Sequence, residues 1–297
     1  MFDKGSTAVL STPDLPFIVA VKKTGLYTFD EGEWHLQYAL SHNIYKLVHI
    51  GSYIFGIGDN GTIVRYNSLL SKWVHTSFPT SQRLWDITGN EQGLIITHGG
   101  SKLYISNNFG LNWSVIKPFE AISAKPTIRS LHYHQGHIYI GTQINRDAGG
   151  LWRYSLTDGE LLLVKKETSS MISSIYMDLE DCLFITKGYA CSDTGEGSLE
   201  MMHAHTGECR TFHSVISEKA FLDVFTVNNK LYTTTSKDAY GFSRIYEIQK
   251  ETQTLLPIET VIGHGFRGAG FNDQLFISSP VESKWICSRS KQAKLLH

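Results

Sequence analysis

A short phrase recurs along the chain at intervals of about 40 to 48 residues, and this repeat constrains the fold more than any other feature. The segments "GTIVRYNSLLSKW" (61–73) and "GLWRYSLTDGEL" (150–161) share a glycine, an Arg-Tyr pair, a polar turn and a second apolar stretch. Tyr66 and Tyr154 lie 88 residues apart, which is two periods of 44. Related phrases occupy 25–34, 101–113, 198–209, 242–255 and 283–296.

Each phrase alternates apolar and polar residues around a polar turn, which is the pattern of a β-hairpin. A second hairpin pattern precedes it, as in "LVHIGSYIFGIGDN" (47–60) and "LHYHQGHIYIGTQI" (131–144). Two hairpins per repeat give four strands. Trp34, Trp73 and Trp113 recur at spacings of 39 and 40 residues, at the expected start of the fourth strand.

Four strands repeated at this period predict an all-β fold, a seven-bladed β-propeller with four antiparallel strands per blade. The composition agrees, because 26 glycines, 7 prolines and 12% aromatic residues suit short strands joined by tight turns. We expect one domain over 1–297. The predicted blades cover about 6–40, 41–80, 81–124, 125–167, 168–216, 217–261 and 262–297.

The segment "SNNFGLNW" (106–113) resembles the Asp-box, or BNR repeat, of sialidase-like propellers, Ser-x-Asp-x-Gly-x-Thr-Trp. Ser106, Gly110 and Trp113 match, whereas Asn108 and Asn112 replace the usual Asp and Thr. The segment 28–34 is a shorter, degenerate copy. The resemblance implies membership of the sialidase-like superfamily at the level of the fold. It does not imply sialidase activity, because the family's Phe/Tyr-Arg-Ile-Pro motif is absent.

The loops that enter first strands, and those that join second to third strands, meet at one axial end of a propeller. Those positions hold the candidate ligand-binding residues Arg83, Arg129, Arg146, Arg267, His98 and Tyr189. Guanidinium groups bind carboxylates and phosphates through paired hydrogen bonds. The alternative is structural, with each arginine donating hydrogen bonds to a carbonyl or to an acid of a neighbouring blade. Asp86 and Asp223 are the nearest such acids.

The fifth repeat contains the weak candidates for metal ligands, which are Cys182, His203, His205 and Cys209. Cysteine and histidine are the ligand types of tetrahedral zinc, but this spacing is not that of a zinc module. We therefore expect no metal. No nucleotide-binding or hydrolase motif is present, so we expect no cofactor and assign no catalytic residue.

The formal net charge of -1 gives no electrostatic reason to expect a nucleic-acid or membrane partner. The first residues lack the pattern of a signal peptide, and the four cysteines lack a disulfide spacing. We expect a soluble cytoplasmic protein with reduced thiols.

Two functions fit these features. The first is a non-catalytic recognition module or scaffold that binds a protein, a peptide or a small anionic ligand on the axial loop face. The alternative is a propeller enzyme, a lyase or hydrolase, with a polar active site over the central channel. The fold is compatible with both functions, so only the chemistry of the site can distinguish a binding module from an enzyme.

Overall fold

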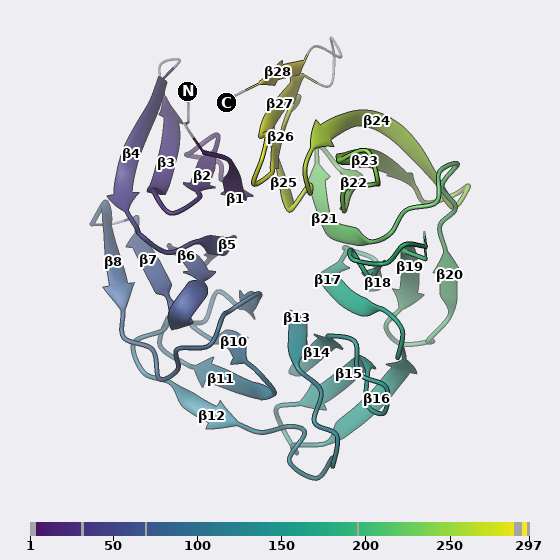
Figure 1. The fold of residues 1–297 in the computed structure, drawn as a ribbon. Coiled ribbons are helices and arrows are strands. Elements are labelled where there is room, and N and C mark those ends of the chain that lie inside the picture. The colour runs from purple at the N-terminus through teal and green to yellow at the C-terminus, as the bar shows by residue number, and fades with distance from the viewer. Residues whose placement is uncertain (1–3, 31–32, 69, 195, 288–292, 296–297) are drawn as a thin grey trace. The chain divides into compact units, whose positions relative to one another are not determined.

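Seven four-stranded antiparallel sheets follow one another along the chain in the computed structural model (Figure 1). The structure describes residues 4–30, 33–68, 70–194, 196–287 and 293–295. In every sheet the strands pair in the order in which they occur in the sequence. Within the described residues the only helical element is the single 3-10 turn Asp59–Gly61. The predicted fold class, a seven-bladed β-propeller with four antiparallel strands per blade, is confirmed.

The first four sheets consist of β1 (Ser6–Leu10), β2 (Ile18–Val21), β3 (Gly25–Asp30) and β4 (Glu33–Ala39); β5 (Ile44–Ile50), β6 (Tyr53–Gly58), β7 (Ile63–Asn67) and β8 (Lys72–Thr76); β9 (Ile87–Gly89), β10 (Ile95–Gly99), β11 (Lys102–Ser106) and β12 (Ser114–Ile116); and β13 (Ile128–His134), β14 (His137–Thr142), β15 (Gly150–Ser155) and β16 (Leu161–Lys166). The other three consist of β17 (Met171–Met177), β18 (Cys182–Gly188), β19 (Ser198–His203) and β20 (Cys209–Thr211); β21 (Phe221–Val227), β22 (Lys230–Thr235), β23 (Phe242–Gln249) and β24 (Thr254–Ile262); and β25 (Arg267–Phe271), β26 (Gln274–Ser278), β27 (Lys284–Cys287) and β28 (Ala293–Leu295).

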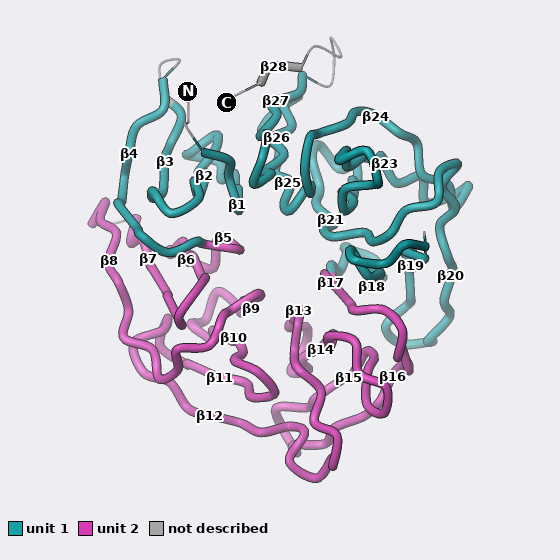
Figure 2. Tube along the Cα trace, in the orientation of Figure 1, with its two compact units in different colours: residues 1–43, 176–297 teal, residues 44–175 magenta. Residues whose placement is uncertain are grey.

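The chain divides into two compact units (Figure 2). Unit 1 comprises residues 1–43 and 176–297, and unit 2 comprises residues 44–175. That residues 1–297 behave as one domain stays a prediction. None of the described helical segments has the length and apolar character needed to cross a membrane.

In unit 1 the first and last sheets are joined. The backbone N–H of Ser6 donates to Ser283 Oγ at 3.3 Å, and the Ser11 hydroxyl donates to the Gly270 carbonyl at 2.5 Å. Phe17 of the first sheet packs on Phe276 of the last, with ring centroids 5.6 Å apart. Segments from opposite ends of the sequence therefore share one hydrophobic cluster.

In unit 2 the repeated phrase forms the third strand of its sheet, as β7 and β15. Arg65 of β7 donates from Nη1 to the Phe109 carbonyl of the next sheet at 2.7 Å. Its guanidinium also lies 4.9 Å from the centre of the Tyr53 ring. Arg65, the arginine of the repeated Arg-Tyr pair, thus connects neighbouring sheets.

The recurrent tryptophans lie where the repeat places them. Trp34 and Trp73 are the second residues of β4 and β8, and Trp113 directly precedes β12. Trp73 is buried, whereas Trp34 and Trp113 are half-buried. Trp113 meets Phe78 edge to face at 5.0 Å. Trp113 therefore contributes to the edge of a hydrophobic cluster rather than to its centre.

The turn that resembles an Asp-box is held by its own side chains. Ser106 Oγ accepts the N–H of Gly110 at 2.9 Å and donates to Asn108 Oδ1 at 2.9 Å. Asn108 Oδ1 also accepts the N–H of Asn112 at 2.9 Å. Asn108 thus supplies the acceptor oxygen that an aspartate would supply at this position.

Candidate functional site

The best-defined group of candidate residues lies in unit 2, at the starts of three successive first strands. The pairing of β5 with β6 shifts register between Ile44 and Lys46, so Tyr45 is bulged. The pairing of β13 with β14 shifts in the same way and bulges Arg129. A β-bulge re-aims the side chain of the extra residue, and such bulges are frequent beside functional sites.

These residues form what we call the arginine–aromatic cluster, which consists of Tyr45, Asp59, Arg83, Trp85 and Arg129. The rings of Tyr45 and Trp85 lie 4.6 Å apart. The Arg129 guanidinium carbon lies 4.3 Å from the centre of the Trp85 ring, and that of Arg83 lies 5.1 Å from the same centre. The two guanidinium carbons are therefore at most 9.4 Å apart, since both distances are measured to the same ring centre.

Asp59 neutralises one side of the cluster. Arg83 Nε donates to Asp59 Oδ1 at 2.8 Å, and the Tyr45 hydroxyl lies 3.1 Å from both carboxylate oxygens. The Arg83 side chain is still 52% exposed, and the ion pair uses Nε. The Nη groups of Arg83 are thus accessible to a ligand.

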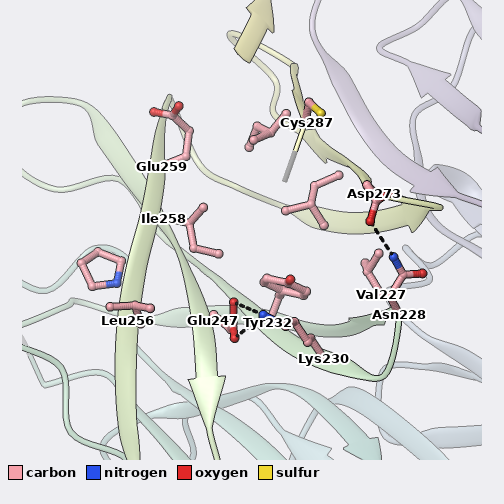
Figure 3. A pocket seen from close by; sticks show the side chains of 13 residues that line it. Val227, Asn228, Lys230, Tyr232, Glu247, Leu256, Ile258, Glu259, Asp273 and Cys287 are labelled. Atoms are coloured by element: carbon pink, nitrogen blue, oxygen red, sulfur yellow. Dashed lines mark hydrogen bonds and ion pairs between the residues drawn. The ribbon is translucent and has the colours of Figure 1, made fainter. Parts of the chain in front are cut away.

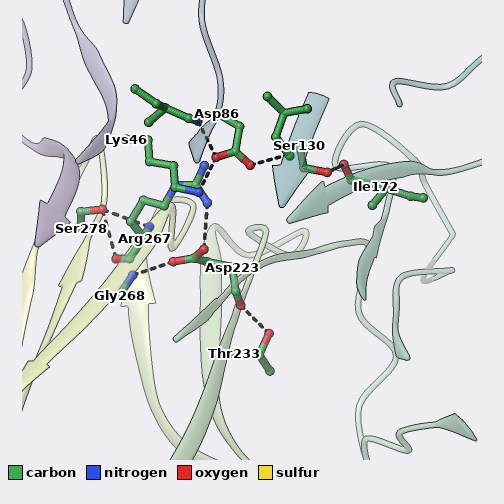
Figure 4. A network of polar contacts seen from close by, with 11 residues as sticks. Lys46, Asp86, Ser130, Ile172, Asp223, Thr233, Arg267, Gly268 and Ser278 are labelled. Atoms are coloured by element: carbon green, nitrogen blue, oxygen red, sulfur yellow. Dashed lines mark hydrogen bonds and ion pairs between the residues drawn. The ribbon is translucent and has the colours of Figure 1, made fainter. Parts of the chain in front are cut away.

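A buried carboxylate next to the cluster links three neighbouring sheets (Figure 4). Asp86 forms an ion pair with Lys46 of β5. The Asp86 carboxylate also accepts two backbone N–H groups, that of Leu131 in β13 at 2.8 Å and that of Ile87, the next residue in the chain, at 2.8 Å. This arrangement satisfies a charge that would otherwise be costly to bury.

Asp223 of unit 1 is a buried aspartate that, like Asp86, binds groups of a neighbouring sheet, and we call each of these two aspartates with its partners an anchor (Figure 4). Arg267 donates from Nη1 to Asp223 Oδ1 at 2.8 Å, and the Gly268 N–H donates to Oδ2 at 3.1 Å. Arg267 is buried in this ion pair. Arg267 therefore binds an acid of a neighbouring sheet, which is the structural role considered above as the alternative to ligand binding.

His98, on β10, is fully buried. Among the described residues neither of its ring nitrogens has a hydrogen-bond partner. Burial lowers the pKa of His98 to about 3; Asp86 raises this pKa, and Arg129 and Lys46 lower it further. Burial also lowers the pKa of nearby His132 to about 4, assisted by Lys46. Both imidazoles are therefore neutral at physiological pH.

The other two candidate ligand-binding residues lie outside the cluster. Arg146 is exposed on the loop after β14, where Asn145 Oδ1 accepts the N–H of Ala148 at 2.8 Å. Tyr189 belongs to unit 1, directly follows β18 and is 47% exposed. Its backbone N–H donates to the carbonyl oxygen of Lys219 at 3.0 Å. Among the described residues of unit 2, Arg146 makes no contact with the cluster.

The four weak metal candidates are engaged in other contacts. Cys182 faces His203 across β18 and β19, but its thiol points to the Glu180 carbonyl at 3.6 Å. His203 Nδ1 accepts the N–H of His205 at 3.3 Å, and Cys209 Sγ lies 3.8 Å from Glu200. No group of three or more His, Cys, Asp or Glu residues in the described ranges could hold a metal ion.

The sequence analysis missed Tyr45, Asp59 and Trp85 as partners of the arginines. Trp85 stands two residues after Arg83 in "SQRLW", and Tyr45 occupies the matching position in the preceding repeat. An aromatic residue at the same first-strand position of two successive repeats is the signal that could have identified them.

Comparison with known proteins gives the fold and one full-length relative. No model of a protein family matches the sequence. The structure is similar to the extracellular domain of the putative one-component system BT4673 from B. thetaiotaomicron, with a TM-score of 0.72 and 16% identity over 95% of this chain. The chain spans 38% of the length of that structure. It is also similar to YCF48 from Cyanidioschyzon merolae, with a TM-score of 0.67, 14% identity and 93% coverage of both chains.

Similarity to those structures extends to the fold alone. In sequence, the chain is similar to the uncharacterized protein YkuO of Bacillus subtilis (strain 168), which is 35% identical over 291 residues. The alignment covers 96% of this chain and 97% of YkuO. With this identity along nearly the whole of both chains, the protein belongs to the same family as YkuO.

Proposed function

We propose that the protein is a non-catalytic recognition module that binds an anionic group, on a small molecule or an acidic protein segment, at the arginine–aromatic cluster. The observation that carries this proposal is that Arg83 and Arg129 both lie over the ring of Trp85. A guanidinium that stacks on an aromatic face keeps the N–H groups of its edge for carboxylate or phosphate oxygens.

The charges of the cluster support an anionic ligand. The cluster contains two guanidinium groups, those of Arg83 and Arg129, and both lie over the Trp85 ring. Guanidinium groups attract carboxylates and phosphates by charge and by hydrogen bonding. Because Arg83 is largely exposed, we expect the attraction to weaken as salt screens it.

The acid–base properties of the neighbouring groups support binding rather than catalysis. A general acid or base works best when its pKa lies near the operating pH. His98 and His132 have pKa values lowered to about 3 and about 4, and the Asp86 carboxylate is occupied by Lys46 and two backbone N–H groups. In the alternative, a lyase or hydrolase, an acid–base group would have to come from elsewhere in the chain.

We also propose a cytoplasmic location and a degenerate Asp-box at 106–113. In the described structure none of the four cysteines forms a disulfide, and Cys191 and Cys209 are exposed, which suits a reducing compartment. The hydrogen bonds of Ser106 and Asn108 support the Asp-box assignment.

Isothermal titration with citrate, succinate and inorganic phosphate tests the proposed binding. We expect at least one of these anions to bind, with an affinity that falls as sodium chloride is added. Arg83→Gln and Arg129→Gln should each weaken binding, whereas Arg210→Gln, at an exposed arginine of β20 in unit 1, should leave it unchanged. Equal affinity in all three variants, with unchanged melting temperatures, would exclude the cluster as the site.

A further inference from the structure

We propose a second binding site in unit 1, which takes a short segment of another protein that carries apolar side chains and an acidic residue. The site is a surface that we call the apolar patch, and it consists of Tyr240, Phe242, Ile262 and Val281 at one end of the β21–β24 and β25–β28 sheets. These residues are 87%, 41%, 44% and 56% exposed, in that order. Scattered apolar residues are normal on a protein surface, whereas a contiguous group of them marks an interaction site.

Three residues of the patch meet where the two sheets adjoin. Phe242 begins β23 and pairs with Ile262, the last residue of β24. Next to this pair, the N–H of Gly263 donates to the carbonyl oxygen of Gly241 at 2.8 Å. A Cβ atom on Gly263 would lie 2.9 Å from Val281 Cγ2. Val281, on the loop between β26 and β27, therefore lies beside the Phe242–Ile262 pair.

Tyr240 is presented by a turn that hydrogen bonds hold in place. Asp238 Oδ1 accepts the N–H groups of Tyr240 and Phe242 at 2.9 and 3.1 Å, and the Asp238 N–H donates to the Phe242 carbonyl at 2.8 Å. Arg244 Nη2 donates to the other carboxylate oxygen of Asp238 at 2.7 Å. A turn that is ordered before binding loses less conformational entropy when a partner binds. Because tyrosine is enriched among the residues that dominate binding energy, Tyr240 is suited to be the main contact.

The charge beside the patch favours an acidic partner. Lys237 is exposed and directly precedes the turn, and its backbone N–H donates to His264 Nδ1 at 3.2 Å. Asp238, the next residue, pairs with Arg244 at 2.7 Å. Within the part of the chain that the structure describes, the Lys237 ammonium group forms no ion pair, so an acidic residue of the bound segment would supply one. This attraction would weaken as salt is added.

The size of the patch suits a short segment better than a second copy of the chain. A stable protein–protein interface buries about 800 Å² on each partner. An aromatic side chain buries about 250 Å² at most, so the four residues at their exposed fractions offer less than about 600 Å² in total. The patch is therefore large enough for a few side chains of a peptide and too small for a stable dimer.

The patch is separate from the cavity between the same two sheets, which has a volume of about 330 Å³ (Figure 3). Leu256 and Ile258 of β24 line this cavity, and its described lining includes no residue of the patch. Leu256 is 55% exposed and stands six residues before Ile262, which is about 20 Å along the strand at roughly 3.3 Å per residue. Leu256 is therefore a matched control, an exposed apolar residue of the same strand that lies outside the patch.

Selection from a phage-displayed library of random peptides on the immobilised full-length protein tests the site. We expect the enriched peptides to combine an aromatic or leucine side chain with an aspartate or glutamate. Fluorescence polarisation then measures the affinity of the most enriched peptide in synthetic form, which should fall as sodium chloride is added. The proposal is overturned if no peptide is enriched, or if the enriched peptides lack acidic residues.

Variants then locate the bound peptide. Tyr240→Ser should weaken binding about 10-fold or more, because the main aromatic contact is lost. Lys237→Gln should weaken it about 2- to 5-fold, which is the effect of losing an exposed ion pair, and should reduce its salt dependence. Leu256→Ser, and Arg83→Gln in the arginine–aromatic cluster, should bind the peptide normally. Wild-type affinity in Tyr240→Ser would show that the peptide binds elsewhere.

Sedimentation velocity distinguishes a peptide from a second copy of the chain. We expect the wild type and Tyr240→Ser to have the same oligomeric state. A wild-type dimer that becomes monomeric in Tyr240→Ser would show that a second copy occupies the patch, and the proposal of a peptide site would then be wrong.

Discussion

Replacing His98 by leucine should make the fold less sensitive to acid. Burial lowers the pKa of His98 from 6.5 to about 3, so the unfolded chain binds a proton near pH 6.5 that the folded chain does not bind until about pH 3. Stability therefore falls as the pH falls through this window. Linkage gives a loss of about 2 kcal/mol from this side chain between pH 7 and pH 5.

Urea denaturation of the wild type and of His98→Leu at pH 7 and pH 5 measures this effect. The loss between the two pH values should be about 2 kcal/mol smaller in the variant. Part of the loss should persist, because His132 also has a lowered pKa. His75→Leu, at an exposed histidine of β8, should keep the wild-type loss.

At pH 7 we expect His98→Leu to be at least as stable as the wild type. Leucine has a similar volume and does not bury the two ring nitrogens, which have no hydrogen-bond partner among the described residues. If the variant lost as much stability between pH 7 and pH 5 as the wild type, His98 would not be neutral in the folded state and the reasoning would fail.

Three further predictions concern stability and redox state. Asp86→Ala should lower the free energy of unfolding by about 3–5 kcal/mol, because Lys46 loses its buried partner; Asp147→Ala, at an exposed aspartate, should cost less than about 0.5 kcal/mol. Trp113→Ala should cost about 3 kcal/mol in chemical denaturation, and a loss under about 1 kcal/mol would contradict its packing against Phe78. All four cysteines should react with iodoacetamide in the unfolded, unreduced protein, and mass spectrometry would detect any pair that remains oxidised.

The fold could be predicted from the sequence because each sheet is made of hairpins between residues close in the chain. Period-2 alternation and turn residues mark such hairpins directly. The bulges at Tyr45 and Arg129 could not be predicted in the same way, since a bulge interrupts the alternation on which the strand pattern depends. Sequence alone therefore placed the arginines at the correct strand starts but did not reveal their aromatic partners.

Contacts between neighbouring sheets were harder to predict, although some of them join residues that are one repeat period apart in the sequence. The carboxylate of Asp86 accepts the N–H of the residue 45 positions later, and so does the carboxylate of Asp223. In both cases the aspartate carbonyl also accepts a threonine hydroxyl from the next strand, Thr97 or Thr233, at 2.8 Å. A contact between equivalent positions of adjacent repeats therefore appears in the sequence as a spacing of one period.

The two anchors explain why Arg129 and Arg267, which look alike in the sequence, have different surroundings. Asp223 takes its cation from the following sheet, where Arg267 directly precedes the residue whose N–H it accepts. Asp86 takes its cation from the preceding sheet, as Lys46. The position in unit 2 that corresponds to Arg267 is consequently a serine, Ser130, whose hydroxyl donates to the Ile172 carbonyl at 2.9 Å. Lys46 neutralises Asp86, and the guanidinium of Arg129 lies over the Trp85 ring. The difference between the two arginines thus follows from which neighbouring sheet supplies the cation.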